Sequence, residues 1–282
     1  MIRVVTEPSR PQGDAASPFF APRAGPAALC LHGLTSTPFE TVPVARALST
    51  AGFSVSAPLL AGHGVDAATL GRTRWQDWLA SAEAGFEELR AASGGGPMAL
   101  IGFSMGGLLA LRLARLRPTE VSALVVASAP LRLRPWQSAA VKAWRRLPRF
   151  LRRGRLAALR KKNGSDVTDE SVRRENPGLR EMPLAAVAEL VALGGIVRRD
   201  LPFIRQPTLV AHGQRDQTVA LQCSYELAGC IASDIVEQLW LPRSGHLLGV
   251  DVERNQLASV VVRFLRRHLP SMAAVPKEAS PA

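Results

Sequence analysis

One glycine–serine motif constrains this chain more than any other feature. The apolar run Met98–Ile101 leads directly into the sequence Gly-Phe-Ser-Met-Gly at positions 102–106, and an apolar stretch of helical character follows from Leu108 to Leu116. A strand that turns sharply into a helix strains its central residue, and flanking glycines let the neighbouring chain come close. Unpaired N–H groups at the start of the helix favour a developing negative charge. The motif therefore predicts a nucleophilic Ser104 rather than an ordinary glycine-rich turn.

Strands and helices alternate along most of the chain. Apolar strands are expected at Ala27–Leu31, Phe53–Leu59, Met98–Ile101, Val121–Ala127, Thr208–Ala211 and Ile235–Leu241. Helices are expected between and after them, at Phe39–Ala51, Thr73–Leu89, Leu108–Leu116, Val219–Ile231 and Gln256–His268. Strands spaced by helices imply a parallel sheet that is covered on both faces. We therefore predict an α/β fold, a mostly parallel sheet with helices on both faces, formed by residues 27–129 and 207–270.

A long basic segment interrupts this alternation. The net charge of +12 is matched by twelve Lys and Arg between residues 131 and 165, a stretch with no Asp or Glu. Helices are expected within the segment at Trp136–Trp144, Leu147–Leu159 and Pro183–Leu193. Because it begins just after a strand end, where such a sheet presents its ligand crevice, residues 130–206 are predicted to form an inserted helical cap. The alternative is a helical decoration away from the crevice. Residues 1–26 are predicted to be irregular, and residues 271–282 a disordered tail.

A nucleophilic serine needs a base and a group that orients the base. Two candidates follow the last two expected strands, Asp216 after the first of them and His246 after the second. Because parallel strands end at the same edge of a sheet, Ser104, Asp216 and His246 are predicted to meet there. His246 would take the Ser104 proton as the serine attacks an acyl carbonyl, and Asp216 would stabilise the imidazolium. The rival candidates are His63 for the base and Asp251 for the acid.

The oxyanion of a tetrahedral intermediate needs hydrogen-bond donors. The backbone N–H of Met105, next to the nucleophile, is one candidate, and that of Leu34, in the loop after the first strand, is the other. Candidate substrate-binding side chains are His63, which lies between two glycines, and Trp136 and Trp144 in the basic segment. No Cys/His grouping has metal-ligand spacing, so the sequence predicts no metal site.

Together these motifs resemble the α/β-hydrolase superfamily, and within it the bacterial carboxylesterase and monoacylglycerol-lipase group. The resemblance runs from about Ala28 to His268 with the cap left out, and it rests on the stretches Leu31–Ser36, Gly62–Gly64, Trp75–Trp78, Gly102–Gly107, His212–Val219 and Ser244–His246. It implies hydrolysis of carboxylic esters without a cofactor, by the triad Ser104, Asp216 and His246 with oxyanion donors at Leu34 and Met105. It also implies that His32 is structural and holds the oxyanion loop. The Arg-rich cap, and the little room for antiparallel strands before Ala27, depart from the pattern of larger members.

We therefore expect a serine hydrolase that cleaves short- or medium-chain acyl esters or monoacylglycerols through an acyl-enzyme on Ser104. The alternatives are a thioesterase, a lysophospholipase at an anionic lipid surface, an acyltransferase that excludes water, and a non-catalytic ligand-binding relative.

The basic segment allows two further expectations about partners and location. It is either solvated or docked on anionic lipid, where each basic residue adds about 1 kcal/mol. Nucleic acid is not an expected partner, because no recognition motif accompanies the charge. No apolar run approaches the roughly 20 residues that cross a bilayer, and the N-terminal residues do not resemble a secretory signal, so a cytoplasmic location is expected. The sequence carries no signal for an oligomeric state.

Overall fold

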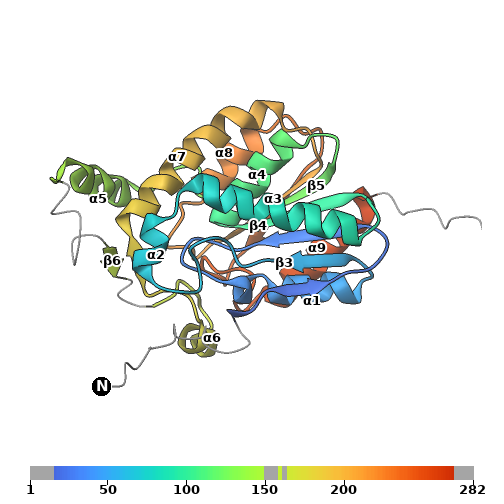
Figure 1. Ribbon diagram of the computed structural model, residues 1–282, viewed down its shortest axis with the longest axis horizontal. Coiled ribbons are helices and arrows are strands. Elements are labelled where there is room, and N and C mark those ends of the chain that lie inside the picture. Colours follow the sequence, from blue (N-terminus) through green and yellow to red (C-terminus); the bar gives the residue numbers. More distant parts are fainter. Residues whose placement is uncertain (1–15, 149–157, 161–163, 270–282) are drawn as a thin grey trace, which may run out of the picture.

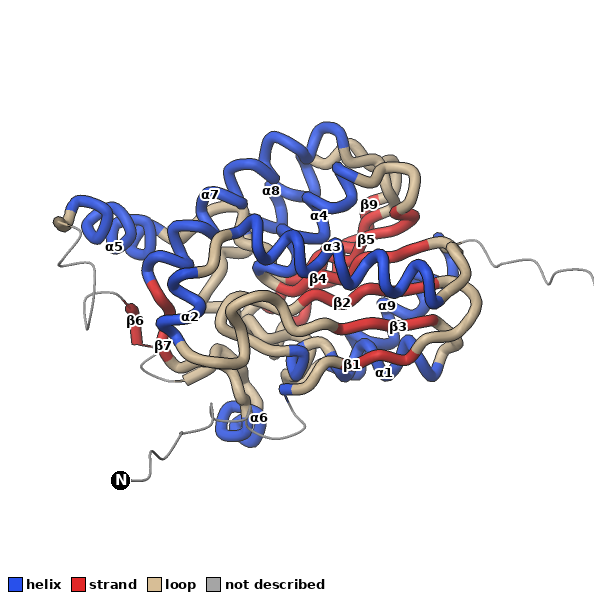
Figure 2. Tube along the Cα trace, viewed as in Figure 1, coloured by secondary structure: helices blue, strands red, loops and turns tan. Residues whose placement is uncertain are grey.

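A seven-stranded sheet forms the centre of the molecule, with helices on both faces (Figures 1 and 2). The computed structural model describes residues 16–148, 158–160 and 164–269. The strands are β1 (Phe19–Ala21), β2 (Ala27–Leu31), β3 (Ser54–Ala57), β4 (Met98–Phe103), β5 (Val121–Ala127), β8 (Thr208–Gly213) and β9 (Val236–Leu241). Their order across the sheet is β1-β3-β2-β4-β5-β8-β9. Neighbouring strands pair in parallel, except that β1 is antiparallel to β3. The predicted mostly parallel α/β architecture is confirmed.

Each strand contributes side chains to two apolar clusters, because successive side chains of a strand point to opposite faces. In β2, Leu29 and Leu31 enter one cluster, and Ala28 and Cys30 enter the other. The first cluster is covered by α3 (Trp75–Ala92), α4 (Met105–Leu116), α7 (Leu184–Asp200) and α8 (Gln222–Cys230). The second is covered by α1 (Val42–Thr50) and α9 (Arg254–His268), with the short 3-10 helix η2 (Pro38–Glu40) preceding α1. Burial on both faces explains why the central strands are continuous apolar runs in the sequence.

Most of the segment 130–206 gathers beyond one end of the sheet (Figure 1). Besides α7 it contains α5 (Pro135–Arg146), β6 (Ala158–Arg160), α6 (Glu170–Glu175) and β7 (Glu181–Pro183). The short helix α2 (Ala67–Arg72) of the core contacts both β7 and α7. We use "cap" below for residues 130–183. The helix α7 is not a separate covering element, since it packs on α3 and α4 and joins their apolar cluster.

The cap differs from the all-helical segment that the sequence predicted. Strands β6 and β7 form an antiparallel pair, so that the end of the helix expected at Leu147–Leu159 is a strand, while residues 149–157 lie outside the described part of the chain. Helix α7 continues to Asp200, beyond the end expected at Leu193. Gly194, just beyond the expected end, packs closely, because a Cβ there would lie 3.2 Å from the carbonyl oxygen of Pro130.

The N-terminal segment also differs from its expectation. Within residues 1–26, which were predicted to be irregular, β1 adds an antiparallel edge strand to the sheet. Three residues are too few to show an alternating pattern, so the sequence carried no strand signal there. The predicted disordered tail, residues 271–282, lies outside the described residues. Across the described part of the chain, no helix combines the length and the apolar character that a membrane span needs.

Candidate active site

Ser104 stands at the turn between β4 and α4 in a conformation that L-residues rarely adopt. Its φ is 53° and its ψ is −117°. A Cβ on Gly102 would overlap the carbonyl oxygen of Gly106, and a Cβ on Gly106 would overlap that of Leu31. Only glycines at these two positions allow so sharp a turn between the strand and the helix. The Ser104 N–H donates to the carbonyl oxygen of Ala127 (2.7 Å), which fixes the turn against β5.

The loops after β4, β8 and β9 bring Ser104, Asp216 and His246 together. His246 Nε2 lies 3.0 Å from Ser104 Oγ, and His246 Nδ1 lies 2.8 Å from Asp216 Oδ2. All three side chains are buried. In the neutral tautomer that fits this arrangement, Nδ1–H donates to Asp216 and Nε2 accepts from the Ser104 hydroxyl. A base hydrogen-bonded in this way to a hydroxyl on one side and to a carboxylate on the other can activate the hydroxyl as a nucleophile.

The electrostatics of the pair favour an imidazolium beside a carboxylate. Burial alone lowers the pKa of His246, but the charge and hydrogen bond of Asp216, together with the charges of Asp166 and Glu40, raise it to about 9. Burial alone raises the pKa of Asp216, and the neighbouring imidazoles of His246 and His212 more than reverse this and hold it well below its usual range. The site therefore stabilises the charged state that a base reaches after it takes a proton from serine.

Asp216 is held by more than its partner histidine. Its Oδ1 accepts the N–H groups of Thr218 (2.8 Å) and Val219 (2.7 Å), as in a tight Asx turn. The buried His212, at the end of β8, places Nε2 at 3.2 Å from Asp216 Oδ2, while its Nδ1 lies 2.7 Å from Ser224 Oγ. His212 thus lies between the Asp216 carboxylate and the Ser224 hydroxyl.

The loop after β2 lies directly against the nucleophile. A Cβ on Gly33 would lie 3.1 Å from Ser104 Cβ. The Gly33 N–H donates to the buried Glu40 carboxylate (3.0 Å), and His32 Nδ1 lies 3.0 Å from the carbonyl oxygen of Gly33. His32 Nε2 also accepts the N–H of Leu60 (3.1 Å), so this histidine ties the loop to the chain after β3.

The two candidate oxyanion donors, Leu34 and Met105, are available for a ligand. Among the described residues, neither backbone N–H donates to another protein group. Met105 begins α4, where the first N–H groups of a helix have no intrahelical partner. Both groups therefore stay candidates for the oxyanion position.

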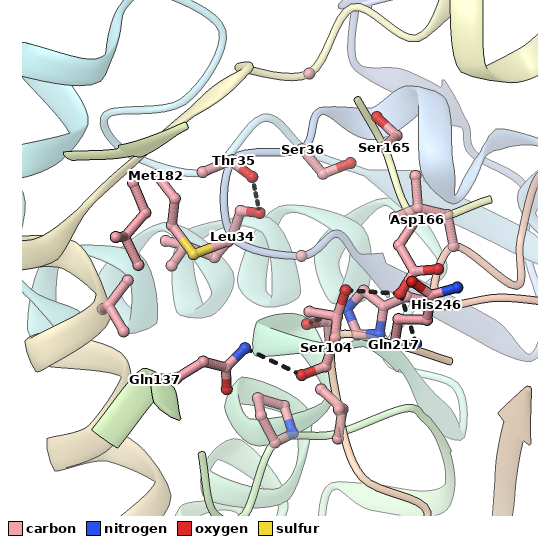
Figure 3. Close-up of a pocket in the computed structure, with 18 of the residues that line it drawn as sticks. Leu34, Thr35, Ser36, Ser104, Gln137, Ser165, Asp166, Met182, Gln217 and His246 are labelled. Atoms are coloured by element: carbon pink, nitrogen blue, oxygen red, sulfur yellow. Dashed lines mark hydrogen bonds between the residues drawn. The ribbon is translucent and has the colours of Figure 1, made fainter. Parts of the chain in front are cut away.

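A cavity of about 190 Å³ opens beside Ser104 and His246 under the cap (Figure 3). In the view of Figure 3, Met182 and Leu34 lie on one side of Ser104, and Asp166 and Ser165 lie on the other. The apolar lining comes mainly from Leu34, Leu133, Leu159, Met182, Val187 and Leu190. The polar lining includes Ser165, Asp166, Asn176, Gln217 and Thr218. The cavity can therefore receive a small group that is apolar at one end and polar at the other.

Of the three candidate substrate-binding side chains, the structure brings Trp136 to the cavity and leaves the other two away from it. Trp136 lines the cavity and is 59% exposed, so it stands at the edge. His63 is buried behind the oxyanion loop, where its ring meets that of His32 at 4.9 Å, and burial lowers its pKa to about 4. Trp144 lines a separate groove with Arg72 and Arg74.

Asp251, the rival candidate for the acid, has a different position. It is fully buried and accepts backbone N–H groups from Thr168, Asp169 and Gly245 at 2.7 to 3.0 Å. It therefore joins the cap to the loop that precedes His246, while the histidine itself faces Asp216.

The sequence reasoning missed the cap residues that reach the site. Asp166, Arg134 and Gln137 all hydrogen-bond to the loop that carries Asp216. No motif marks them, because their partners are 51 to 85 residues further along the chain; the only signal was that Asp166 is the first acidic residue after the basic run. Within the described residues, no group of three or more His, Cys, Asp or Glu side chains could hold a metal ion.

A buried Ser–His–Asp arrangement at the strand ends of a mostly parallel sheet defines an α/β-hydrolase. Comparison with known families agrees, since residues 24–253 match the family described as serine aminopeptidase, S33. The chain belongs to this family.

Two curated bacterial relatives match nearly the whole chain. The thermostable monoacylglycerol lipase of Bacillus sp. (strain H-257) is 28% identical over 260 residues, which cover 90% of this chain and 96% of the relative. The carboxylesterase of Bacillus subtilis (strain 168) is 25% identical over 251 residues, which cover 89% of this chain and 96% of the relative.

Solved structures support the same fold. One of two metagenome-derived lipolytic enzymes superposes with a TM-score of 0.81 and 25% identity, covering 90% of this chain and 99% of that one. A soluble variant of the monoglyceride lipase from Saccharomyces cerevisiae superposes with a TM-score of 0.72, covering 93% of this chain and 99% of that one. At 17% identity, the yeast enzyme shows the shared fold alone.

Proposed function

We propose that this chain is a serine hydrolase that cleaves carboxylic esters through an acyl-enzyme on Ser104. The observation that carries the proposal is the hydrogen-bonded series Ser104–His246–Asp216 beside an apolar cavity. The family membership and the names of the two bacterial relatives support the same chemistry.

The mechanism follows from the positions of the five groups. As Ser104 Oγ attacks the acyl carbonyl, its proton passes to His246 Nε2, and Asp216 stabilises the imidazolium. The backbone N–H groups of Leu34 and Met105 stabilise the oxyanion, each for about 10²–10³ in turnover. The proton on Nε2 then goes to the leaving alcohol oxygen, which leaves the acyl group on Ser104. Water attacks this ester in the same way, with His246 as the base, and releases the carboxylic acid.

The substrate that we propose is a short- or medium-chain acyl ester of a small polar alcohol, such as a monoacylglycerol. The acyl chain would lie on the side of Leu34 and Met182, where apolar side chains line the cavity. The alcohol would lie on the side of Ser165, whose hydroxyl can bond its free hydroxyls.

The test is hydrolysis of p-nitrophenyl esters and monoacylglycerols across acyl lengths, with fluorophosphonate labelling in parallel. We expect the parent to hydrolyse the shorter esters and to be labelled. The variant Ser104→Ala should lose labelling and about 10⁵-fold or more of kcat, whereas Ser233→Ala, in the loop before β9, should match the parent. A parent that neither hydrolyses nor labels would contradict the proposal and favour a ligand-binding relative. Preference for thioesters or for amino-acyl p-nitroanilides would reassign it as a thioesterase or a peptidase.

A second proposal concerns where the enzyme works. We propose that the cap docks on anionic lipid, because Trp136 is 59% exposed and Lys142, Arg145 and Arg146 on the same helix are also exposed. The protein should co-sediment with phosphatidylglycerol vesicles at low salt, and Lys142→Glu/Arg146→Glu should release it. Failure of the parent to co-sediment would refute lipid docking. We also propose a cytoplasmic location, which cell fractionation would test.

A further inference from the structure

One cap residue, Asp166, bonds both loops of the acid–base pair. Its carboxylate oxygen Oδ2 accepts the N–H of Gln217 (2.9 Å) and the hydroxyl of Thr218 (2.7 Å). Its backbone carbonyl accepts the N–H groups of His246 (3.0 Å) and Leu247 (3.1 Å). The side chain therefore fixes the loop that carries Asp216, while the backbone of the same residue fixes the loop that carries His246. Figure 3 shows Asp166 beside Gln217 and His246 at the edge of the cavity.

The loop of Asp216 is held by the cap on its other side as well. Arg134 Nη2, just before α5, donates to the carbonyl oxygens of Asp216 (2.8 Å) and Val219 (3.2 Å). Gln137 Nε2 donates to the carbonyl oxygen of Thr218 (3.1 Å). The acid loop thus lies between two parts of the cap, and its position relative to β9 depends on both.

Asp166 is also one of the charges that act on the base. The carboxylates that face His246 come from three elements: Asp216 after β8, Glu40 in η2, and Asp166 in the cap. Each favours the imidazolium over the neutral ring. Of the three, only Asp166 belongs to the cap.

We propose that Asp166 is a positioning residue that ties the Asp216 loop to the His246 loop and so makes the cap part of the catalytic assembly. The inference rests on the proposed esterase function. Its physical basis is that a misplacement of about 1 Å between reacting groups costs up to about 100-fold in rate. The two loops share a backbone hydrogen bond before these residues, from the N–H of Arg215 to the carbonyl oxygen of Ser244 (3.0 Å), and Asp166 adds the bonds that reach Gln217, Thr218 and His246 themselves.

Two substitutions separate the hydrogen bonds of Asp166 from its charge. Asp166→Ala removes both side-chain bonds, and we expect kcat for a p-nitrophenyl ester to fall about 10- to 100-fold. Asp166→Asn keeps an oxygen that can accept from Gln217 and Thr218 but removes the charge. It should keep the plateau kcat of the parent within about threefold, while the acidic limb of its kcat/KM profile moves to lower pH by roughly half a unit or more.

Asp169→Ala is the matched control, since Asp169 lies in the same cap segment but bonds the start of α6 and Arg254 rather than a catalytic loop. It should keep the parent's kcat and pH profile. An unchanged kcat in Asp166→Ala, an equal loss in Asp169→Ala, or an unshifted limb in Asp166→Asn would each overturn the inference. The Asn variant preserves the hydrogen bonds, so it remains informative if Asp166→Ala does not fold. A parent that fails to hydrolyse or label refutes the proposed function itself, whereas an active parent with parent-like Asp166 variants refutes only this inference.

Discussion

Three carboxylates act on His246, the proposed base, and their effect on its protonation is both favourable and unfavourable for the proposed reaction. The same charges that stabilise the imidazolium during the reaction also favour it in the free enzyme, where a protonated ring cannot accept the serine proton. With the pKa of His246 raised to about 9 by Asp216, Asp166 and Glu40 against the effect of burial, the neutral, competent form gains population only as the pH rises.

The pH dependence of activity follows from the raised pKa of His246. We expect kcat/KM to rise with pH along a one-proton limb whose midpoint lies near 9, well above the 6.5 of a free histidine. The measurement is a kcat/KM profile from about pH 5.5 to 10 with two esters of different leaving-group acidity, which should share the limb because it belongs to the free enzyme. A midpoint at or below 6.5 would contradict the electrostatic description of the site.

The buried pair His32 and His63 predicts sensitivity to acid. Burial and the charge of His63 lower the pKa of His32 to about 3, and burial lowers that of His63 to about 4. The unfolded chain, with ordinary histidines near 6.5, binds more protons than the folded one below that pH, so stability is lost as the pH falls from about 6.5 towards 4. Each ring contributes about 1.4 kcal/mol per pH unit in this window.

Urea unfolding at pH 7 and pH 5 would measure this loss. The free energy of unfolding should fall by several kcal/mol between the two, and the fall should be smaller in His63→Gln, which keeps polar groups but does not titrate. Equal losses in the parent and the variant would show that other groups cause the acid sensitivity.

Among the elements, the turn from β4 through Ser104 into α4 tolerates substitution of its glycines poorly. Gly106→Ala would push its Cβ into the carbonyl oxygen of Leu31, so α4 would have to move away from β2. We expect a loss of about 3 kcal/mol or more in the free energy of unfolding, together with lost activity as Ser104 moves. Gly195→Ala in α7 is the control, since a Cβ there meets nothing within 4 Å, and it should gain about 0.5–1 kcal/mol. Chemical unfolding and ester hydrolysis of both variants test the difference; similar stabilities would refute it.

The sequence predicted elements well where their signals are local. The apolar strands, the turn at Ser104 and the order Ser, Asp, His all follow from short stretches, so the sheet and the three loops that carry Ser104, Asp216 and His246 could be expected in advance. The pairing of β6 with β7 could not, because each has three residues and the partner lies about twenty positions away. The end of α7 was also misplaced, since the helix continues to Asp200, and the close approach of Gly194 to the carbonyl oxygen of Pro130 is a tertiary contact that no local pattern carries.

At the scale of the whole molecule, hydrogen bonds join the cap to the core. One group of these bonds is accepted by the buried carboxylate of Asp251. It accepts N–H groups from Thr168 and Asp169 in the cap and from Gly245 in the core. Asp251→Ala would leave these buried donors without a protein acceptor. The expected loss is about 3 kcal/mol or more, with faster proteolysis between α6 and the core.

Limited proteolysis and chemical unfolding of Asp251→Ala would check this, with the exposed Asp234→Ala as control. The stability and the proteolysis rate of Asp251→Asn should lie between those of Asp251→Ala and Asp234→Ala. The asparagine keeps one acceptor oxygen but turns its amide towards a backbone donor. Cap cleavage at the parent's rate in Asp251→Ala would show that other contacts hold the cap.

The cap also contacts the oxyanion loop, through the N–H of Leu179 and the carbonyl oxygen of Thr35 (2.8 Å). The loops after β2, β8 and β9 are therefore all hydrogen-bonded to the cap, which both covers the cavity and positions these loops. An acyl chain too long for the cap to keep these contacts would still bind, but the loops that carry Asp216 and His246 would then be held less firmly. Selectivity for acyl-chain length would then appear as a lower kcat for long chains rather than as a higher KM, because the discrimination would follow substrate binding.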